Sequence, residues 1–292
     1  MKIVLFGKNG QLGWELERSL PLLGTVISVD REELDLCDLH AVQQALQELK
    51  PDLVINASAY TDVDRAERES ELTIKVNALA PGVMAETARK LGAVLVHYST
   101  DYVFDGKKSS PYTENDATNP LNVYGKSKLM GEEHIQQAGG AYLILRTSWV
   151  YSLRGNSFVN KVLGWARKNS TLKIVEDQVS SPTWARMLSE VTCLLLAQHR
   201  TELLDEIRER RGIYHLAGSG HTSRYEWAKQ ILVNDPHRAD HTVQTIEPAR
   251  TEEFPTPATR PLFSALDCTH FEQTCGLRLP PWDRTLELAM AG

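Results

Sequence analysis

A tyrosine and a lysine stand four positions apart in the segment Tyr124-Gly125-Lys126-Ser127-Lys128. On a helix, this spacing places the phenol of Tyr124 and the ammonium of Lys128 on one face, one turn apart. A nearby cation favours the phenolate, so we expect Lys128 to lower the pKa of Tyr124 from about 10 toward the working pH. The pair is therefore a candidate for proton transfer, although a Tyr–Lys pair alone is also a common surface contact.

A hydroxyl group stands upstream of this pair, where the apolar run at residues 93–99 ends in Ser99-Thr100-Asp101-Tyr102. Thr100 is placed to hydrogen-bond a substrate carbonyl, while its alternative role is to cap the end of a strand. Thr100, Tyr124 and Lys128 behind a nucleotide-binding loop would support hydride transfer between an alcohol and a carbonyl.

The segment Gly7-Lys8-Asn9-Gly10-Gln11-Leu12-Gly13 lies between a predicted strand and a predicted helix. Glycines there permit a tight turn and let backbone N–H groups approach a pyrophosphate at the helix N-terminus. Asp30 ends the next strand, where an acidic side chain hydrogen-bonds an adenosine ribose. Arg31 could instead contact a 2′-phosphate, so the residues leave both NADH and NADPH open.

The elements that position these residues alternate along the first half of the chain. Apolar runs predict strands at 2–6, 25–29, 52–59, 93–99 and 141–148, and helical spacing predicts helices at 10–20, 39–49, 69–91 and 121–137. This alternation predicts an α/β fold with a doubly wound, Rossmann-type parallel sheet. We expect residues 1–150 to form an NAD(P)-binding domain, completed by parts of 171–216. Residues 151–292 would form a smaller C-terminal α/β region that binds the substrate.

Composition excludes several other classes of protein. The chain has 292 residues and a net charge of −6, so it lacks the positive field that nucleic acid or an anionic membrane would require. No apolar run approaches the length of a membrane span, and the opening apolar segment is too short for a signal peptide. Four scattered cysteines form no CxxC pair, which favours a reducing cytoplasm and argues against a zinc site.

Several segments resemble those of the extended short-chain dehydrogenases/reductases. These are the GxxGxxG loop, Asn56-Ala57-Ser58-Ala59-Tyr60, which resembles the segment along the adenosine side of the cofactor, and Asp38-Leu39, which resembles an acidic pair at the adenine ring. The resemblance implies catalysis by Thr100, Tyr124 and Lys128. It implies cofactor contacts from Gly7, Asn9, Gly10, Gln11, Leu12, Gly13, Asp30, Arg31, Asp38, Leu39, Ala57, Ser58, Ala59, Tyr60, Tyr124 and Lys128.

Longer strings are similar to one family among these enzymes, the dTDP-4-dehydrorhamnose reductases. They include Ser99-Thr100-Asp101-Tyr102-Val103-Phe104-Asp105-Gly106, Arg146-Thr147-Ser148-Trp149-Val150-Tyr151 and Pro255-Thr256-Pro257-Ala258-Thr259-Arg260-Pro261. The resemblance implies NAD(P)H-dependent reduction of dTDP-4-dehydro-L-rhamnose at C4, the last step of dTDP-L-rhamnose synthesis for surface polysaccharide. It implies substrate contacts from Thr100, Asp101, Tyr102, Trp149, Asn156 and Arg260.

Two alternatives stay open, and one departure from the family is visible. The chain could be another NDP-4-keto-6-deoxysugar reductase or, more remotely, a non-catalytic regulatory subunit of the same fold. A dehydratase is disfavoured because Tyr102 follows Asp101 where those enzymes carry a second carboxylate. Some family members dimerise around magnesium, and Glu15 matches one acidic position, but Arg186 replaces another. Magnesium prefers oxygen ligands, so we expect no metal site and a monomer or homodimer.

Overall fold

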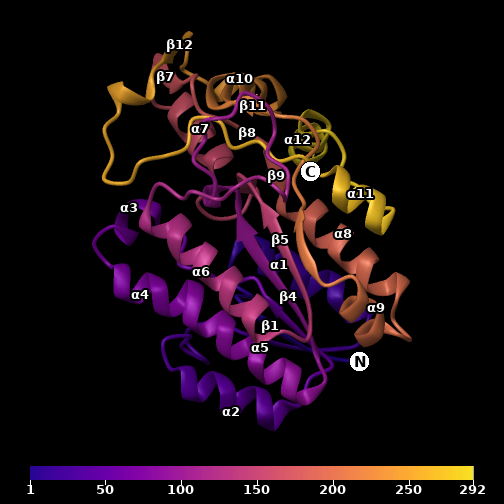
Figure 1. The fold of residues 1–292 in the computed structure, drawn as a ribbon. Helices are drawn as coiled ribbons and strands as arrows, with labels where there is room; N and C mark the ends of the chain where they lie inside the picture. Colours follow the sequence, from indigo (N-terminus) through magenta and orange to yellow (C-terminus); the bar gives the residue numbers. More distant parts are fainter. Residues whose placement is uncertain (292) are drawn as a thin grey trace.

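A six-stranded parallel sheet forms the centre of the computed structural model, which describes residues 1–291 (Figure 1). Its strands lie in the order β2 (Thr25–Val29), β1 (Lys2–Phe6), β3 (Leu53–Asn56), β4 (Val94–Thr100), β5 (Ala141–Thr147) and β10 (Gly212–His215). The chain leaves β1 toward one edge of the sheet and returns to build the other, so the predicted doubly wound fold is confirmed. Ligands bind such sheets beyond the carboxyl ends of the strands, next to this reversal.

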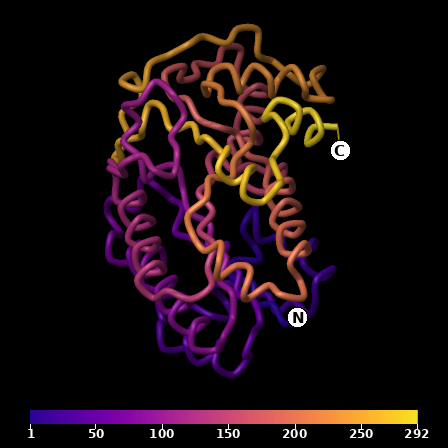
Figure 2. Tube along the Cα trace, turned by 45° about the vertical axis from the view of Figure 1, so that its right-hand side comes forward, coloured from indigo at the N-terminus to yellow at the C-terminus, as the bar shows by residue number. Residues whose placement is uncertain are grey.

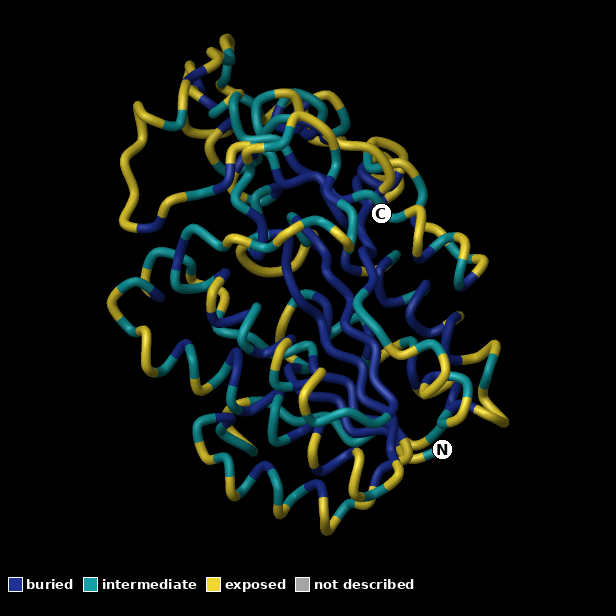
Figure 3. Tube along the Cα trace, viewed as in Figure 1, coloured by how far each residue is buried: buried dark blue, intermediate teal, exposed yellow. Residues whose placement is uncertain are grey.

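The strands are mostly apolar because both faces of the sheet are covered, and their buried polar residues gather toward the carboxyl ends. In β1, Ile3 and Leu5 pack into one layer, and Val4 and Phe6 pack into the other. The first layer contains α1 (Gln11–Ser19), α8 (Ala185–Gln198) and α9 (Leu203–Glu209), and the second contains α2 (Leu39–Leu49), α5 (Ala80–Leu91) and α6 (Val123–Ala138). Figure 3 shows the strands as a buried centre between helices whose outer sides are exposed.

The prediction of one continuous helix at residues 69–91 is wrong, because the segment is interrupted by a π-helical turn. After α3 (Val63–Ala66), the segment begins as α4 (Ser70–Ile74), widens into the π-helical turn η2 (Lys75–Leu79) and continues as α5. The buried Asn77 in this turn accepts the Tyr60 N–H at 2.7 Å and donates to the Tyr60 carbonyl at 3.0 Å and to Ser127 at 3.0 Å. The irregular turn therefore ties the segment after β3 to α6, and such turns often mark functional sites.

The second half of the chain supplies only one strand to the central sheet. This strand is β10, which pairs with β5, whereas β7 (Thr171–Val175) pairs with β12 (Thr245–Ala249) outside the central sheet. With α7 (Phe158–Ala166), α10 (Arg224–Asn234) and α12 (Trp282–Met290), β7 builds a separate core around Trp227.

This second core lies over the carboxyl end of the central sheet, as Figures 1 and 2 show. Gly292, the last residue of the predicted second region, lies outside the described residues. Short segments complete this half: β6 (Val150–Tyr151), β8 (Val179–Ser180), β9 (Thr183–Trp184), β11 (Thr222–Ser223) and α11 (Thr269–Cys275). Across residues 1–291, the structure contains no helix with the length and apolar character needed to span a bilayer.

Candidate active site

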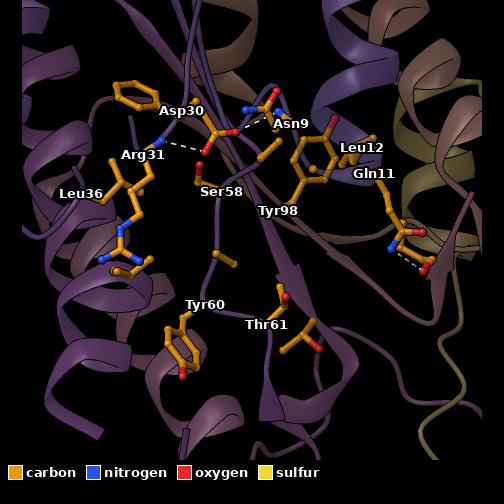
Figure 4. A pocket seen from close by; sticks show the side chains of 18 of the residues that line it. Asn9, Gln11, Leu12, Asp30, Arg31, Leu36, Ser58, Tyr60, Thr61 and Tyr98 are labelled. Carbon is orange, nitrogen blue, oxygen red and sulfur yellow. Dashed lines mark hydrogen bonds between the residues drawn. The ribbon is translucent and has the colours of Figure 1, made fainter. Parts of the chain in front are cut away.

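A cavity of about 700 Å³ lies beyond the carboxyl ends of β1 to β5 (Figure 4). It extends from the glycine-rich loop to the loop after β5, and we call it the central cavity. The structure thus brings together most of the residues predicted from sequence. Those lining the cavity are Gly7, Asn9, Gly10, Gln11, Leu12, Asp30, Arg31, Ala57, Ser58, Ala59, Tyr60, Thr100, Asp101, Tyr124, Lys128, Trp149 and Asn156.

The glycine-rich loop is shaped as a nucleotide cradle. Gly7 has φ +92°, and a Cβ there would lie 2.7 Å from the Ser58 hydroxyl oxygen. Gly13 does not line the cavity, because its role is packing: a Cβ there would lie 1.9 Å from the Gly7 carbonyl oxygen. α1 therefore sits directly on the loop, and its N-terminus faces the cavity, which fits the diphosphate of a dinucleotide.

Asp30 closes the adenosine side of the cradle. Its carboxylate accepts the Asn9 N–H at 2.8 Å and the Arg31 N–H at 2.7 Å (Figure 4). The Arg31 side chain is 75% exposed, with Nε 3.9 Å from Asp35. Asp30 can accept a ribose hydroxyl and Arg31 is free to meet a phosphate, so this arrangement fits NADH and NADPH alike.

The predicted adenine contact at Asp38-Leu39 is displaced by three residues. Asp38 caps α2 by accepting the Ala41 N–H at 2.9 Å, and Leu39 lines a separate surface hollow. Asp35 and Leu36 line the central cavity instead, and Figure 4 shows Leu36 beside the Arg31 side chain. The sequence contains two Asp-Leu pairs three residues apart, and only the start of α2 decides which one faces the cavity.

Lys128 is held at the floor of the cavity rather than against Tyr124. Its Nζ donates to the Tyr98 carbonyl at 2.6 Å and lies 3.0 Å from His97 Nε2. Burial lowers the pKa of Lys128 to about 8, against a smaller opposing effect of Glu132.

The expected lowering of the Tyr124 pKa is not found. Burial raises the pKa of the Tyr124 phenol, while a hydrogen bond with Thr100 opposes the shift. The prediction fails because removal of the phenol from water penalises the phenolate, and the amine of Lys128 is directed to β4. Tyr124 is therefore a well-protonated phenol, which is the form that an acid must have before it gives up its proton.

Asp101 forms a buried carboxylate beside Thr100. It accepts hydrogen bonds from the hydroxyls of Thr100 at 3.1 Å, Ser180 at 3.1 Å and Ser264 at 2.5 Å. Burial nevertheless raises its pKa to about 6, because three hydroxyl donors only partly replace the lost water. Ser180 and Ser264 come from the second half of the chain, so this carboxylate joins the two halves at the site.

Asp101→Asn is expected to make stability less dependent on pH. Since the folded pKa lies above the unfolded value, the stabilising contribution of the protonated carboxyl is present below about pH 4 and lost as the pH rises through about 6. The variant has no such proton to lose, so its stability relative to the parent should improve by about 2–3 kcal/mol between pH 4 and pH 8. Urea unfolding of both proteins at the two pH values measures this; an equal difference at both would contradict it.

Trp149 presents an aromatic surface to the cavity from a strained backbone. Its φ of +40° lies in the left-handed region, which is costly for a large side chain. Its ring stacks on Trp227 with centroids 5.4 Å apart, and the guanidinium of Arg224 lies 3.6 Å from the ring centroid. The packing of the second core thus holds Trp149 at the edge of the site.

Arg224, whose guanidinium lies over the Trp149 ring at the edge of the cavity, is a residue that the sequence interpretation did not single out. Among the described residues, no hydrogen bond or ion pair is formed by its guanidinium, and burial lowers its pKa to about 10. Asp101 favours the charged guanidinium, whereas the positive charge of Arg260 disfavours it. No sequence signal distinguishes this arginine from the others, because its position depends on Trp149 and Trp227.

Two predicted substrate residues do not line the central cavity. Tyr102 packs its ring edge-on to Tyr124, with centroids 5.8 Å apart. Arg260 is engaged by Asp64, with Nη1 at 3.1 Å and Nη2 at 2.6 Å from the two carboxylate oxygens. Asp64 compensates the positive charge of Arg260. The positive charge of Arg224 has no such ion-pair partner among the described residues.

Glu15, the weak magnesium candidate, has surroundings that do not suit a metal. Burial raises its pKa, and the guanidiniums of Arg186 and Arg18 oppose that shift. Arg186 itself pairs with Glu190 at 3.0 Å. In the part of the chain that the structure describes, no three His, Cys, Asp or Glu side chains gather as metal ligands. These cations would repel Mg²⁺, so the residues present do not fit that ion.

Comparison with known proteins confirms the family resemblance. The family described as RmlD substrate binding domain matches residues 1–292. The dTDP-4-dehydrorhamnose reductase of Burkholderia thailandensis is 42% identical over 291 residues, covering 97% of this chain and 95% of that protein. The solved dTDP-4-dehydrorhamnose reductase of Clostridium acetobutylicum is 36% identical with a TM-score of 0.90, covering 100% of this chain and 99% of that one. The Bacillus anthracis enzyme, solved in complex with NADP, is 33% identical with a TM-score of 0.88 and coverages of 99% and 98%.

Proposed function

The chain belongs to the RmlD substrate binding domain family, and on this premise we propose that it reduces the C4 carbonyl of dTDP-4-dehydro-L-rhamnose to give dTDP-L-rhamnose. One observation carries the proposal: a single cavity holds the nucleotide cradle at Gly7 and Asp30 together with Thr100, Tyr124 and Lys128. Similarity to dTDP-4-dehydrorhamnose reductases over nearly the whole chain supports this choice of sugar nucleotide.

The residues of the chain supply binding, orientation and a proton. Bound NAD(P)H supplies the hydride that reaches the carbonyl carbon. Tyr124 then gives its phenolic proton to the C4 oxygen as the C–O double bond becomes single. Thr100, whose hydroxyl donates to Asp101 in this structure, orients that oxygen by turning the same proton toward it. Lys128, fixed at the floor of the cavity by the Tyr98 carbonyl, has a further N–H for a ribose hydroxyl. Burial keeps Tyr124 protonated until the oxygen needs the proton.

We propose that both NADH and NADPH serve as reductant. Asp30 favours a ribose with a free 2′-hydroxyl, whereas the exposed guanidinium of Arg31 favours a 2′-phosphate. NADP in the Bacillus anthracis structure supports the second of these.

The substrate region rests on residues 151–292, laid over the NAD(P)-binding region of residues 1–150 and β10. At the junction of the two regions we assign the sugar to Trp149 and Asp101, and the nucleotide diphosphate to Asn156, Arg260 and Arg224. Burial raises the pKa of the Tyr102 phenol, and the guanidiniums of Arg224 and Arg260 both oppose that shift. The chain would act in the cytoplasm as a monomer or homodimer, in keeping with four free cysteines and a nicotinamide cofactor.

Arg224→Gln is expected to weaken binding of dTDP by about tenfold and to leave thymidine binding unchanged. The uncompensated guanidinium can form charge-assisted hydrogen bonds with a diphosphate, which a glutamine cannot replace and thymidine does not offer. Titration calorimetry with both compounds measures the difference. Arg186→Gln is the matched control, since that guanidinium also lies over a tryptophan ring but is paired with Glu190. Equal losses for dTDP and thymidine would contradict the assignment.

The proposed activity is tested by oxidation of NADPH and of NADH with dTDP-4-dehydro-L-rhamnose, generated in situ by the enzymes that precede it. We expect cofactor oxidation and a product identified as dTDP-L-rhamnose. Oxidation that occurs only with a 4-keto-6-deoxysugar of other stereochemistry or another nucleotide would assign the chain to a sister reductase. Cofactor binding without oxidation of any such substrate would instead support a regulatory subunit.

A further inference from the structure

One loop of the second half, residues 152–156, is attached to the first turn of α1. This loop follows β6, and the Ser152 N–H donates to the Gln11 side chain at 2.8 Å. The same side chain donates from Nε2 to the Val150 carbonyl at 3.5 Å. Gln11 is the first residue of α1 and lines the central cavity (Figure 4). The loop is therefore fixed beside the end of the helix that faces the nucleotide cradle.

The backbone of this loop is also held by contacts of its own. The Ser152 hydroxyl accepts the Arg154 N–H at 3.1 Å and donates to the Arg154 carbonyl at 2.9 Å. On α7, the side-chain amide of Asn160 donates to the carbonyls of Leu153 at 3.0 Å and Gly155 at 2.8 Å. Neighbours on both sides thus fix the backbone from which the Arg154 side chain extends.

The guanidinium of Arg154 lies over the ring of Trp14, with its carbon 3.9 Å from the ring centroid. Both residues line the central cavity, and Trp14 stands one turn after the start of α1. The hydrogen bonds that Arg154 forms among the described residues are those of its backbone. Stacking on an aromatic face orients a guanidinium and leaves the N–H groups in its plane free to donate.

Of the residues that the structure describes, three with cationic side chains line the central cavity: Arg31, Lys128 and Arg154. Arg31 lies at the adenosine side of the cradle, and the Lys128 amine is held at the floor by the Tyr98 carbonyl at 2.6 Å. Arg154 is the one beside α1, whose N-terminus is the part of the cradle that fits a diphosphate.

The rest of the cradle offers a diphosphate only partial positive charge. The N–H groups at the start of α1 carry such charge, and Gly10 at the cap supplies no side chain. Lys8 of the glycine-rich loop pairs with Glu33 and does not line the cavity. A guanidinium brings a full charge and paired donors, which match the geometry of phosphate oxygens.

We propose that Arg154 binds the diphosphate of the nicotinamide cofactor, and that Trp14 is a positioning residue that holds the guanidinium for this contact. The proposal rests on the proposed function, because it requires a dinucleotide in the central cavity. It adds a ligand from the second half of the chain to a cradle built by the first. The sugar nucleotide also carries a diphosphate, but the stacking of Arg154 on α1 favours that of the cofactor.

Binding of NADH, NADPH and ADP-ribose to Arg154→Gln tests the contact. All three carry the diphosphate, so we expect affinity to fall by about tenfold for each at low salt, which is the effect of one charge-assisted hydrogen bond. The loss should shrink at high salt, because Arg154 is exposed and its charge is screened. Arg31→Gln should instead weaken NADPH alone. Unchanged ADP-ribose binding by Arg154→Gln, or a loss confined to NADPH, would overturn the proposal.

Two controls separate this contact from other effects of the same substitution. Arg18→Gln is the matched variant, since the Arg18 guanidinium also lies over the Trp14 ring, at 3.4 Å, but does not line the cavity. It should leave ADP-ribose binding unchanged. Titration of Arg154→Gln with dTDP identifies the source of the diphosphate: we expect no change, and weaker dTDP binding with normal ADP-ribose binding would give Arg154 to the substrate.

The role of Trp14 is tested by combining substitutions. Trp14→Leu should weaken ADP-ribose binding, and Arg154→Gln should then cost less than it does in the parent chain. Trp14→Phe keeps an aromatic face and should restore most of the affinity. Equal costs of Arg154→Gln in both backgrounds would exclude Trp14 as the residue that positions it. These titrations need no turnover, so their outcome is independent of the assay that tests the reductase activity.

Discussion

Tyr124→Phe is expected to lower turnover of the sugar nucleotide by about 10²–10⁴-fold, the usual contribution of a positioned general acid. The variant keeps the ring that packs edge-on against Tyr102 and loses only the hydroxyl that gives up the proton. Thr100 and Lys128 remain in place, but neither can replace it, because an aliphatic hydroxyl is a much weaker acid than a phenol and the Lys128 amine is bound to β4. Steady-state kinetics with saturating NADPH measures the loss.

The control for this variant is the neighbouring phenol. Tyr102→Phe removes the hydroxyl of the neighbouring ring, whose centroid lies 5.8 Å from that of Tyr124. Tyr102 does not line the central cavity. Its effect on turnover should be at least about tenfold smaller than that of Tyr124→Phe. NADPH affinity, measured by fluorescence, should be unchanged in both variants. Near-normal turnover of Tyr124→Phe would exclude the phenol as the proton donor.

Glu132→Gln is expected to cost about 3–5 kcal/mol of stability, because it breaks a buried ion pair by removing one partner. The Glu132 carboxylate accepts from Arg146 Nε at 2.9 Å and Nη2 at 2.6 Å, and from the Ser99 hydroxyl. The two charged side chains are only 1% and 3% exposed. Arg146 Nη1 already lacks a partner, so the variant would leave a guanidinium in the core with no opposite charge. Chemical denaturation measures the change.

An exposed ion pair provides the matched comparison for Glu132. Glu226 lies 3.0 Å from Lys229 on α10, with both side chains largely in water. Because such pairs contribute little, Glu226→Gln should change stability by less than about 1 kcal/mol. If Glu132→Gln also loses less than about 1 kcal/mol of stability, the prediction is contradicted. The Arg146 guanidinium would then be stabilised in the core without the Glu132 carboxylate.

Local patterns were sufficient to predict most of the fold. The apolar strands, the helices between them and the glycine-rich turn depend on contacts within a few residues, so β1, β2 and α2 form where expected. The break between α4 and α5 could not be predicted in this way. It depends on Asn77, whose amide bonds Tyr60 and Ser127, far away in the sequence.

The same distinction separates Asp35 from Asp38 in the site. Both precede a leucine, and the short irregular segment between β2 and α2 has no periodicity that favours one over the other. Asp38 is used to cap α2, and the cavity therefore receives Asp35 and Leu36. Arg260 depends on a contact still farther along the chain, since the guanidinium predicted to contact the substrate forms an ion pair with Asp64, 196 positions away.

The sequence by itself determined which groups the site contains: a phenol and an amine one helical turn apart, a hydroxyl at a strand end, and glycines at a nucleotide loop. Spacing within an element is enough for that, because helix and strand geometry are local. Only the tertiary structure decided how those groups ionise. Burial raises the pKa of Tyr124 and lowers that of Lys128, and His97 with the Tyr98 carbonyl draws the amine away from the phenol. Proton affinity depends on which distant segments exclude water and supply hydrogen bonds, and these are known only once the chain has folded.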